Sequence, residues 1–131
     1  LKTVLIIDDE PAILELLGLT LLKKGFCVLS TANGQAGVEL ARVHIPDLII
    51  LDISIPDFDG KQIVQQLRAQ AATKDIPVLI HTATTLNEQE RHDLAAQVQS
   101  ISFKNEADVL FAELERLEKM NNQNWEMEES L

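Results

Sequence analysis

Carboxylate side chains follow directly after two apolar runs in this chain of 131 residues. Asp8 and Asp9 come after Val4–Ile7, and Asp52 comes after Leu48–Leu51. Four consecutive large aliphatic residues with no polar alternation are typical of a strand that is buried on both faces of a parallel sheet. Open α/β sheets bind ligands at the carboxyl ends of their strands, so we expect the three carboxylates to converge if these strands are neighbours.

Carboxylates at such short range repel one another. Either one of them takes up a proton, or a hard cation lies among them. No Cys or His lies nearby at the spacing of a zinc site, and an all-oxygen set suits Mg²⁺ better than Zn²⁺. The motif therefore predicts a protonated carboxylate or a magnesium site.

Two further side chains with useful chemistry end predicted strands. Thr82 closes the run Val78–Thr82, and Lys104 follows Ile101–Phe103. A hydroxyl donates a hydrogen bond to an anion and an ammonium neutralises its charge, although a threonine or lysine at such a position more often has no special role. His81 is a phosphoryl acceptor in principle, but a lone strand histidine is usually packed, so we leave it outside the site.

Helical signals alternate with strand signals along the chain. Helices are predicted at Pro11–Lys24, at Gln35–Val43, around Ile63–Leu67 and from Asn87 to about Val98. A last helix is predicted after a cap at Asn105, with its buried residues at Val109, Leu110, Leu114 and Leu117. Phe26–Ser30 is predicted to be a further strand. Five alternations joined by right-handed crossovers predict one parallel sheet between two layers of helices.

The composition is that of one globular domain, with 46% hydrophobic and 24% charged residues. No apolar stretch approaches the ~18 residues of a membrane span, so we expect no membrane insertion. The single cysteine, Cys27, cannot form an internal disulfide, and we expect a buried thiol in a reducing, cytoplasmic compartment. The net charge of -10 argues against direct nucleic-acid binding.

The C-terminal segment differs from the rest in composition. Residues 105–131 carry eight acidic and two basic residues, and residues 121–131 show no clear period. We predict a domain over residues 1–119 and a tail or linker over residues 120–131. Trp125 in this tail is either an anchor for a partner or an ordinary tail residue.

The predicted strands are followed by a set of polar residues: an acidic pair after the first strand, Asp after the third, Thr after the fourth and Lys after the fifth. This set resembles the receiver (CheY-like) domain of response regulators in two-component signalling. The resemblance covers roughly Lys2–Lys119. It implies a flavodoxin-like, doubly wound α/β fold, with five parallel strands in the order 2-1-3-4-5 and five helices on two faces. It also implies a regulatory phosphoacceptor domain, which assists its own phosphotransfer and dephosphorylation, rather than an enzyme for external substrates.

The resemblance also implies roles and partners. Asp52 is expected to accept a phosphoryl group from phosphohistidine of a sensor histidine kinase or histidine phosphotransfer protein. Asp9 is expected to bind Mg²⁺ directly, Asp8 largely through water, and the backbone carbonyl of Ser54 to complete the protein's ligands with Asp52. A switched protein-binding surface would then act on an output domain or effector protein.

Two more roles and two departures follow from the same comparison. Thr82 is expected to hydrogen-bond the phosphoryl group, and Lys104 to pair with it. Most receivers have proline after this lysine, following a cis bond, but here Asn105 stands there. Ile101 replaces the usual switch aromatic, and an aliphatic side chain has no polar tip with which to move between two environments.

Two alternatives remain open from the residues. The departures at Ile101 and Asn105 are compatible with a receiver-like module that binds proteins without phosphorylation. An aspartate-nucleophile phosphatase of the dehalogenase type needs Asp-x-Asp after a strand, and neither Asp8-Asp9-Glu10 nor Asp52-Ile53-Ser54 has that pattern.

Overall fold

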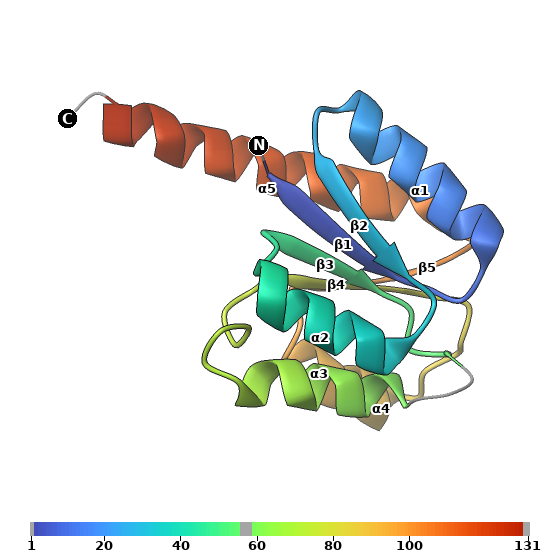
Figure 1. The fold of residues 1–131 in the computed structure, drawn as a ribbon. Coiled ribbons are helices and arrows are strands. Elements are labelled where there is room, and N and C mark those ends of the chain that lie inside the picture. Colours follow the sequence, from blue (N-terminus) through green and yellow to red (C-terminus); the bar gives the residue numbers. More distant parts are fainter. Residues whose placement is uncertain (1, 56–58, 130–131) are drawn as a thin grey trace.

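The computed structural model describes residues 2–55 and 59–129, and for Ala107 and residues 120–129 it describes the course of the helix but not the side chains. Strands and helices alternate along these residues (Figure 1). The strands are β1 (Thr3–Ile7), β2 (Cys27–Thr31), β3 (Leu48–Leu51), β4 (Val78–Thr82) and β5 (Ser100–Phe103). The helices are α1 (Pro11–Lys23), α2 (Gly34–His44), α3 (Gly60–Ala69), α4 (Glu88–Ala95) and α5 (Ala107–Glu129).

The five strands form one parallel sheet in the order β2-β1-β3-β4-β5. This order confirms the predicted flavodoxin-like α/β fold. β1 and β3 are neighbours, and their register pairs Ile7 with Leu51. Asp8 and Asp52 each follow one of these paired residues, so the register alone places the two carboxylates side by side at the carboxyl edge of the sheet.

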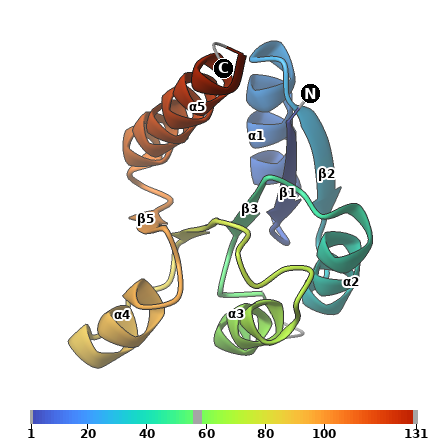
Figure 2. The same ribbon diagram turned by 90° about the vertical axis from the view of Figure 1, so that its left-hand side faces the viewer.

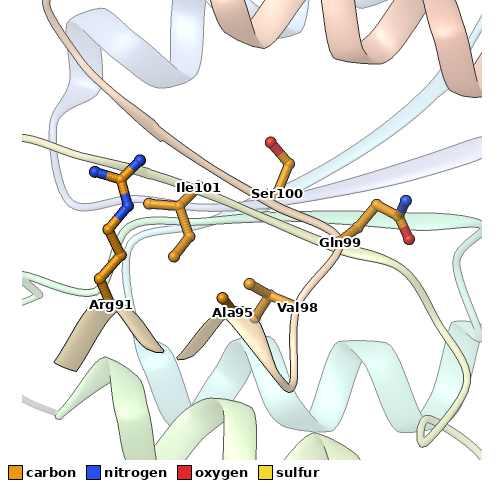
Figure 3. A pocket seen from close by; sticks show the side chains of 6 residues that line it. All are labelled: Arg91, Ala95, Val98, Gln99, Ser100 and Ile101. Atoms are coloured by element: carbon orange, nitrogen blue, oxygen red, sulfur yellow. The ribbon is translucent and has the colours of Figure 1, made fainter. Parts of the chain in front are cut away.

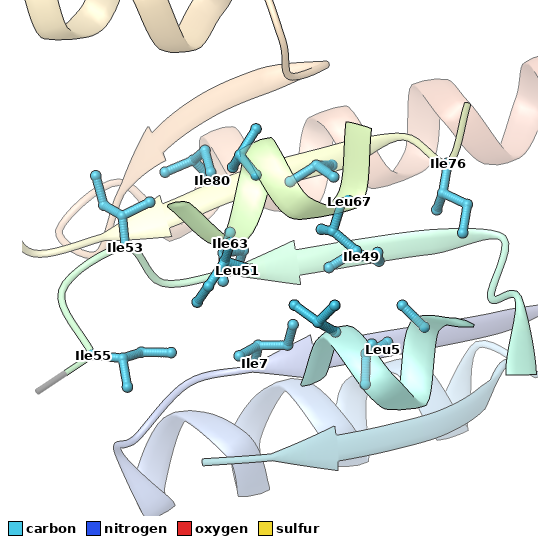
Figure 4. Packing of buried hydrophobic residues seen from close by; sticks show 14 of the residues in the cluster. Leu5, Ile7, Ile49, Leu51, Ile53, Ile55, Ile63, Leu67, Ile76 and Ile80 are labelled. Carbon is cyan, nitrogen blue, oxygen red and sulfur yellow. The ribbon is translucent and has the colours of Figure 1, made fainter. Parts of the chain in front are cut away.

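Helices cover both faces of the sheet. α1 and α5 lie on one face, and α2, α3 and α4 lie on the other (Figure 2). Successive strand residues point to opposite faces, so Leu5 and Ile7 pack toward α2 and α3 (Figure 4) while Val4 and Ile6 pack toward α1 and α5. Both faces are therefore apolar, which explains the unbroken aliphatic run in β1.

The ends of several elements have local causes. Pro11 stands in the first turn of α1, where its missing N–H removes no helical hydrogen bond. Asn87 caps α4 by accepting from the backbone N–H of Glu90, whose side chain accepts in return from the Asn87 N–H, as the predicted capping box requires. None of the helices in the described residues combines the length and apolar character needed to cross a membrane.

The C-terminal helix differs from the prediction. α5 begins at Ala107, two residues after Asn105, so Asn105 does not cap it. It continues through Glu129, because no glycine or proline interrupts residues 107–129. Val109, predicted to be buried, is 40% exposed, whereas Leu110 and Leu114 are buried. The side chain of Trp125 lies outside the described residues, and the domain boundary at residue 119 stays a prediction.

Cys27 also differs from the prediction. It opens β2 at the edge of the sheet, and its side chain is exposed rather than buried. An edge strand packs against only one neighbouring strand, so its residues have a strand-like sequence pattern although they are only partly covered.

Gly60 fixes the loop that follows Asp52. It opens α3, and a Cβ built on it would overlap the backbone Cα of Ile53. Asp59 caps the same helix by accepting from the Lys61 N–H at 3.0 Å. α3 therefore approaches the β3 terminus closely only because residue 60 has no side chain.

We expect Gly60→Ala to destabilise the fold by about 1–3 kcal/mol, since the backbone of Ile53 must shift to admit the methyl group. Gly18→Ala is the matched control, because a Cβ at Gly18 in α1 meets nothing within 4 Å. It should stabilise the fold by about 0.5–1 kcal/mol through the higher helix propensity of alanine. Urea unfolding of both variants measures the difference, and changes of equal sign would contradict this view of Gly60.

Candidate functional site

Asp52 lies at the carboxyl end of β3 and is 1% exposed. Its Oδ1 atom accepts from the Ser54 backbone N–H at 2.9 Å, the Ser54 hydroxyl at 2.7 Å and the Thr82 hydroxyl at 2.8 Å. Its Oδ2 atom accepts from Lys104 Nζ at 2.9 Å. Four donors therefore fix the position of this carboxylate and stabilise its ionised form.

Lys104 brings a positive charge to this carboxylate from the far side of β4. Its ammonium nitrogen lies 2.9 Å from Asp52 Oδ2, 3.2 Å from Asp8 Oδ2 and 2.5 Å from Glu10 Oε1. The Lys104 backbone N–H donates to the Thr82 carbonyl at 2.9 Å, which ties the end of β5 to β4. The Lys104 side chain is 10% exposed, so its ion pairs with Asp8 and Asp52 lie away from water, whereas Glu10 is 52% exposed.

The acidic side of the site has a donor set that suits a hard cation. Carboxylate oxygens of Asp8, Glu10 and Asp52 all lie within 4.8 Å of one another. Oxygen ligands of this kind are those that Mg²⁺ takes in proteins, usually with water completing the octahedron. These oxygens suit the predicted ion, but the group differs from the predicted ligands, because it contains Glu10 and does not contain Asp9, which is half-buried.

The structure brings together most of the residues that the sequence singled out. Asp8, Asp52, Thr82 and Lys104 are joined by direct contacts. Ser54 takes part through its N–H and hydroxyl, which both donate to Asp52.

Glu10 is the acid of the site that sequence reasoning missed. The run Asp8-Asp9-Glu10 was a visible signal, but only the turn after β1 shows which acids face Lys104. In that turn the Glu10 backbone N–H donates to Asp8 Oδ1 at 2.9 Å, and both carboxylates reach the same ammonium.

Burial and hydrogen bonding act in opposite directions on the two buried carboxyl groups. Burial raises the pKa of Asp8, and the bonds from the Glu10 backbone and Lys104 only partly offset this. Burial also acts to raise the pKa of Asp52, but the hydrogen bonds from Lys104, Ser54 and Thr82 together lower it below its ordinary value. The folded state thus favours the ionised form of Asp52 and disfavours the ionised form of Asp8.

The same balance keeps Lys104 charged. Burial acts to lower its pKa, but hydrogen bonds to Glu10, Asp52 and Asp8 raise the pKa well above the ordinary range of a lysine. Lys104 therefore carries its full charge across the physiological range.

His81 is a packed strand histidine, as predicted. It is buried, and its Nδ1 atom lies 3.2 Å from the Ser102 hydroxyl, which donates to the Ile80 carbonyl at 3.2 Å. Burial lowers the pKa of His81, and the charge of Lys104 adds to this. The imidazole therefore favours its uncharged form at neutral pH, and its Nδ1 atom is engaged by Ser102.

The region between α4 and β5 shows the two departures from the usual receiver pattern. Ile101 is half-buried and lines a hollow of about 160 Å³ under α4, together with Arg91, Ala95, Val98, Gln99 and Ser100 (Figure 3). The aromatic ring of this strand belongs instead to Phe103, which pairs with Thr82 in the sheet and lies 5.8 Å from the Arg91 guanidinium. The peptide bond before Asn105 is trans.

A larger open hollow of about 700 Å³ adjoins Lys104. Its lining comes from the turns after β4 and β5 and from α4: Ala83, Thr85, Leu86, Arg91, Phe103, Lys104, Asn105 and Glu106. Phe103, which pairs with Thr82 in the sheet, lines this hollow, whereas Ile101, which pairs with Ile80, does not.

We expect Asp8→Asn and Asp52→Asn to change stability in opposite directions in Mg²⁺-free buffer at pH 7. The raised pKa of Asp8 means that folding disfavours its ionised form, so Asp8→Asn should raise the melting temperature. The lowered pKa of Asp52 means that folding favours its ionised form. Loss of its charge-assisted hydrogen bonds should cost about 1–3 kcal/mol.

The pH dependence tests the cause. The stability contributed by Asp52 is present above the unfolded pKa of 3.8 and is lost as the pH falls through its lower folded pKa. The penalty at Asp8 is full above its raised folded pKa and disappears as the pH falls to 3.8, so the advantage of Asp8→Asn should shrink over that range. Thermal unfolding from pH 3 to 8 measures both, and changes of the same sign in the two variants would contradict the assignment.

Comparisons with known proteins agree with this geometry. Residues 4–115 match the family model of the response regulator receiver domain. The DNA-binding dual master transcriptional regulator RpaA of Synechocystis is 45% identical over 80 residues, which cover 61% of this chain and 33% of RpaA. Protein PilH of Pseudomonas aeruginosa is 43% identical over 79 residues, which cover 60% of this chain and 65% of PilH. The chain spans about a third of the length of the transcriptional regulators among these relatives.

Solved structures give the same result. The chemotaxis response regulator CheY4 of Vibrio cholerae superimposes with a TM-score of 0.78 at 27% identity, over 88% of this chain and 98% of CheY4. The N-terminal domain of a response regulator receiver protein from Methanoculleus marisnigri gives a TM-score of 0.74 at 28% identity, over 87% of this chain and 93% of that domain. With its strand order, its cluster of acids and lysine, and a family match over most of its length, this chain belongs to the response regulator receiver domain family.

Proposed function

We propose that this receiver domain accepts a phosphoryl group on Asp52 from the phosphohistidine of a sensor histidine kinase or a histidine phosphotransfer protein, with Mg²⁺ bound. The observation that carries the proposal is the Asp52 carboxylate itself, which is buried, ionised and held by four donors beside an ammonium group. A carboxylate in this setting is a competent nucleophile toward phosphorus.

The transfer exchanges one bond to phosphorus for another. An Asp52 oxygen forms the new P–O bond while the P–N bond to the donor imidazole breaks, and the nitrogen keeps that electron pair. Such transfers need positioning and charge neutralisation more than covalent assistance. Lys104 supplies a positive charge at 2.9 Å from Asp52 Oδ2, and Ser54 and Thr82 orient the other oxygen.

The proposed ligands of Mg²⁺ are Asp9 directly, Asp8 largely through water, Asp52 and the backbone carbonyl of Ser54. The short separation of the Asp8 and Asp52 oxygens supports a shared cation. When bound, Mg²⁺ supplies charge neutralisation at the phosphoryl oxygens. The raised pKa of Asp8 supports the same site, because a buried carboxylate without sufficient positive charge nearby gains most from a cation.

Thr82 is the proposed reporter of phosphorylation. Its hydroxyl donates to Asp52 Oδ1 at 2.8 Å and accepts from the Thr84 backbone N–H at 3.2 Å. A phosphoryl group adds negative charge and new acceptor oxygens at Asp52, so the hydroxyl gains a better partner than the carboxylate oxygen. Its movement would disturb the contact with Thr84 and so the turn that leads to α4.

The partners and location follow from the same proposal. Receiver domains of response regulators act between a phosphodonor and an output, so we assign the domain a protein partner on each side and a place in the cytoplasm. The net charge of -10 argues against direct contact with nucleic acid, so any such contact would be made by an output domain. The receiver domain is proposed to end near residue 119, and the family match ends at residue 115.

Acetyl phosphate and Mg²⁺ should convert the wild-type chain to a form carrying one phosphoryl group, visible by mass spectrometry and lost in alkali as an acyl phosphate is. Asp52→Asn should show none, and EDTA should prevent the reaction in the wild type. Asp75→Asn, which changes an exposed aspartate in the turn before β4, is the matched control and should react normally.

Absence of phosphorylation in a folded wild-type chain, or normal phosphorylation of Asp52→Asn, would overturn the proposal. The first result would favour a module that binds proteins without phosphorylation. Turnover of an external phosphomonoester by the wild type would instead revive a phosphatase function.

A further inference from the structure

Glu10 contacts the lysine of the site but has no part in the proposed transfer. Its Oε1 atom lies 2.5 Å from Lys104 Nζ, which is the shortest of the three ion pairs of that lysine. The Glu10 side chain is 52% exposed, whereas that of Lys104 is 10% exposed. Glu10 therefore lies at the solvent side of the site and holds the ammonium from outside.

The donors of Lys104 are fully used in this arrangement. An ammonium has three protons to donate, and three carboxylates, those of Asp8, Glu10 and Asp52, surround it at hydrogen-bond distance. A phosphoryl oxygen on Asp52 can therefore receive a bond from Lys104 only if one of the three present bonds is given up.

The Asp52 carboxylate loses its own charge when it is phosphorylated, so its bond to Lys104 passes to the phosphoryl group, and Asp8 and Glu10 remain as the competing carboxylates. Burial decides which of these two holds the ammonium less firmly. Asp8 is 3% exposed, and a buried carboxylate that loses its partner bears the whole cost of desolvation. Water reaches Glu10 and replaces the ammonium there at little cost. The Lys104–Glu10 pair is thus the bond that breaks most easily.

We propose that Glu10 is the resting counter-ion of Lys104 and competes with the phosphoryl group for it. This inference rests on the proposed phosphorylation of Asp52. Glu10 holds the ammonium in the resting state, releases it when the phosphoryl group arrives, and by its charge lowers the affinity of the site for that group. Glu10 is in this sense a positioning residue that acts through Lys104.

The test titrates beryllofluoride, a phosphoryl mimic, into the whole chain at saturating Mg²⁺ and follows binding by NMR. Glu10→Gln keeps the shape of the side chain and removes its charge. It should raise the affinity for beryllofluoride roughly two- to five-fold, the range that a partly exposed ion pair supports. Glu106→Gln is the matched control, because Glu106 is exposed two residues after Lys104 and makes no ion pair with the described residues. It should leave the affinity within about two-fold of the wild type.

Two further measurements separate this role from others. In the Mg²⁺-free protein, the NMR signals of the Lys104 side chain should shift in Glu10→Gln and not in Glu106→Gln, and the absence of that difference would overturn the inference. The affinity for Mg²⁺ alone should weaken by no more than about three-fold in Glu10→Gln. A greater loss would make Glu10 a metal ligand and would also overturn it.

The outcomes distinguish the inference from the proposed function. If beryllofluoride leaves the wild type unchanged, the proposed function fails and the inference fails with it. If the wild type responds and Glu10→Gln binds beryllofluoride equally or more weakly, the proposed function stands and the role of Glu10 is wrong.

Discussion

The ammonium of Lys104, held among the carboxylates of Asp8, Glu10 and Asp52, is the interaction on which the site depends. Without that charge, the two buried carboxylates beside each other could not both stay ionised. The sheet order makes the arrangement possible, because β3 lies between β1 and β4 and brings Asp52 between the other acids and the end of β5. The fold and the charge balance of the site are therefore parts of one constraint.

Apolar packing on both faces of the sheet gives this constraint its precision. β1 and β3 bury every residue between Val4 and Ile7 and between Leu48 and Leu51, so any slip in register would separate Asp8 from Asp52. The same burial raises the pKa of Asp8, which shows that the site is held against an electrostatic cost. Proteins commonly accept such a cost where function needs it and offset it in the core.

Particular residues show how far the sequence alone carries. The runs Val4–Ile7 and Leu48–Leu51 predicted the central strands, because four consecutive aliphatic residues are typical of a strand buried on both faces. The pairing of these strands places Asp8 and Asp52 together, as predicted for neighbouring strands. The roles of Glu10 and Asp9 could not be separated, since a turn and not a period decides which acid faces inward. The exposure of Cys27 and the length of α5 depend on what covers them, which local pattern does not record.

If Asp52 is phosphorylated as proposed, the saturation of the site gives a physical reason for the change to propagate. Lys104, Ser54 and the Thr82 hydroxyl already donate to carboxylate oxygens, so added acceptor oxygens cannot simply take spare donors. They must exchange partners with the groups already bonded, and a buried polar network of this kind changes between discrete arrangements because half-satisfied states are costly. Thr82 is bonded to Thr84 and pairs with Phe103 in the sheet. Under the proposed function, an exchange at its hydroxyl would first reach the turn before α4 and the ring that contacts Arg91.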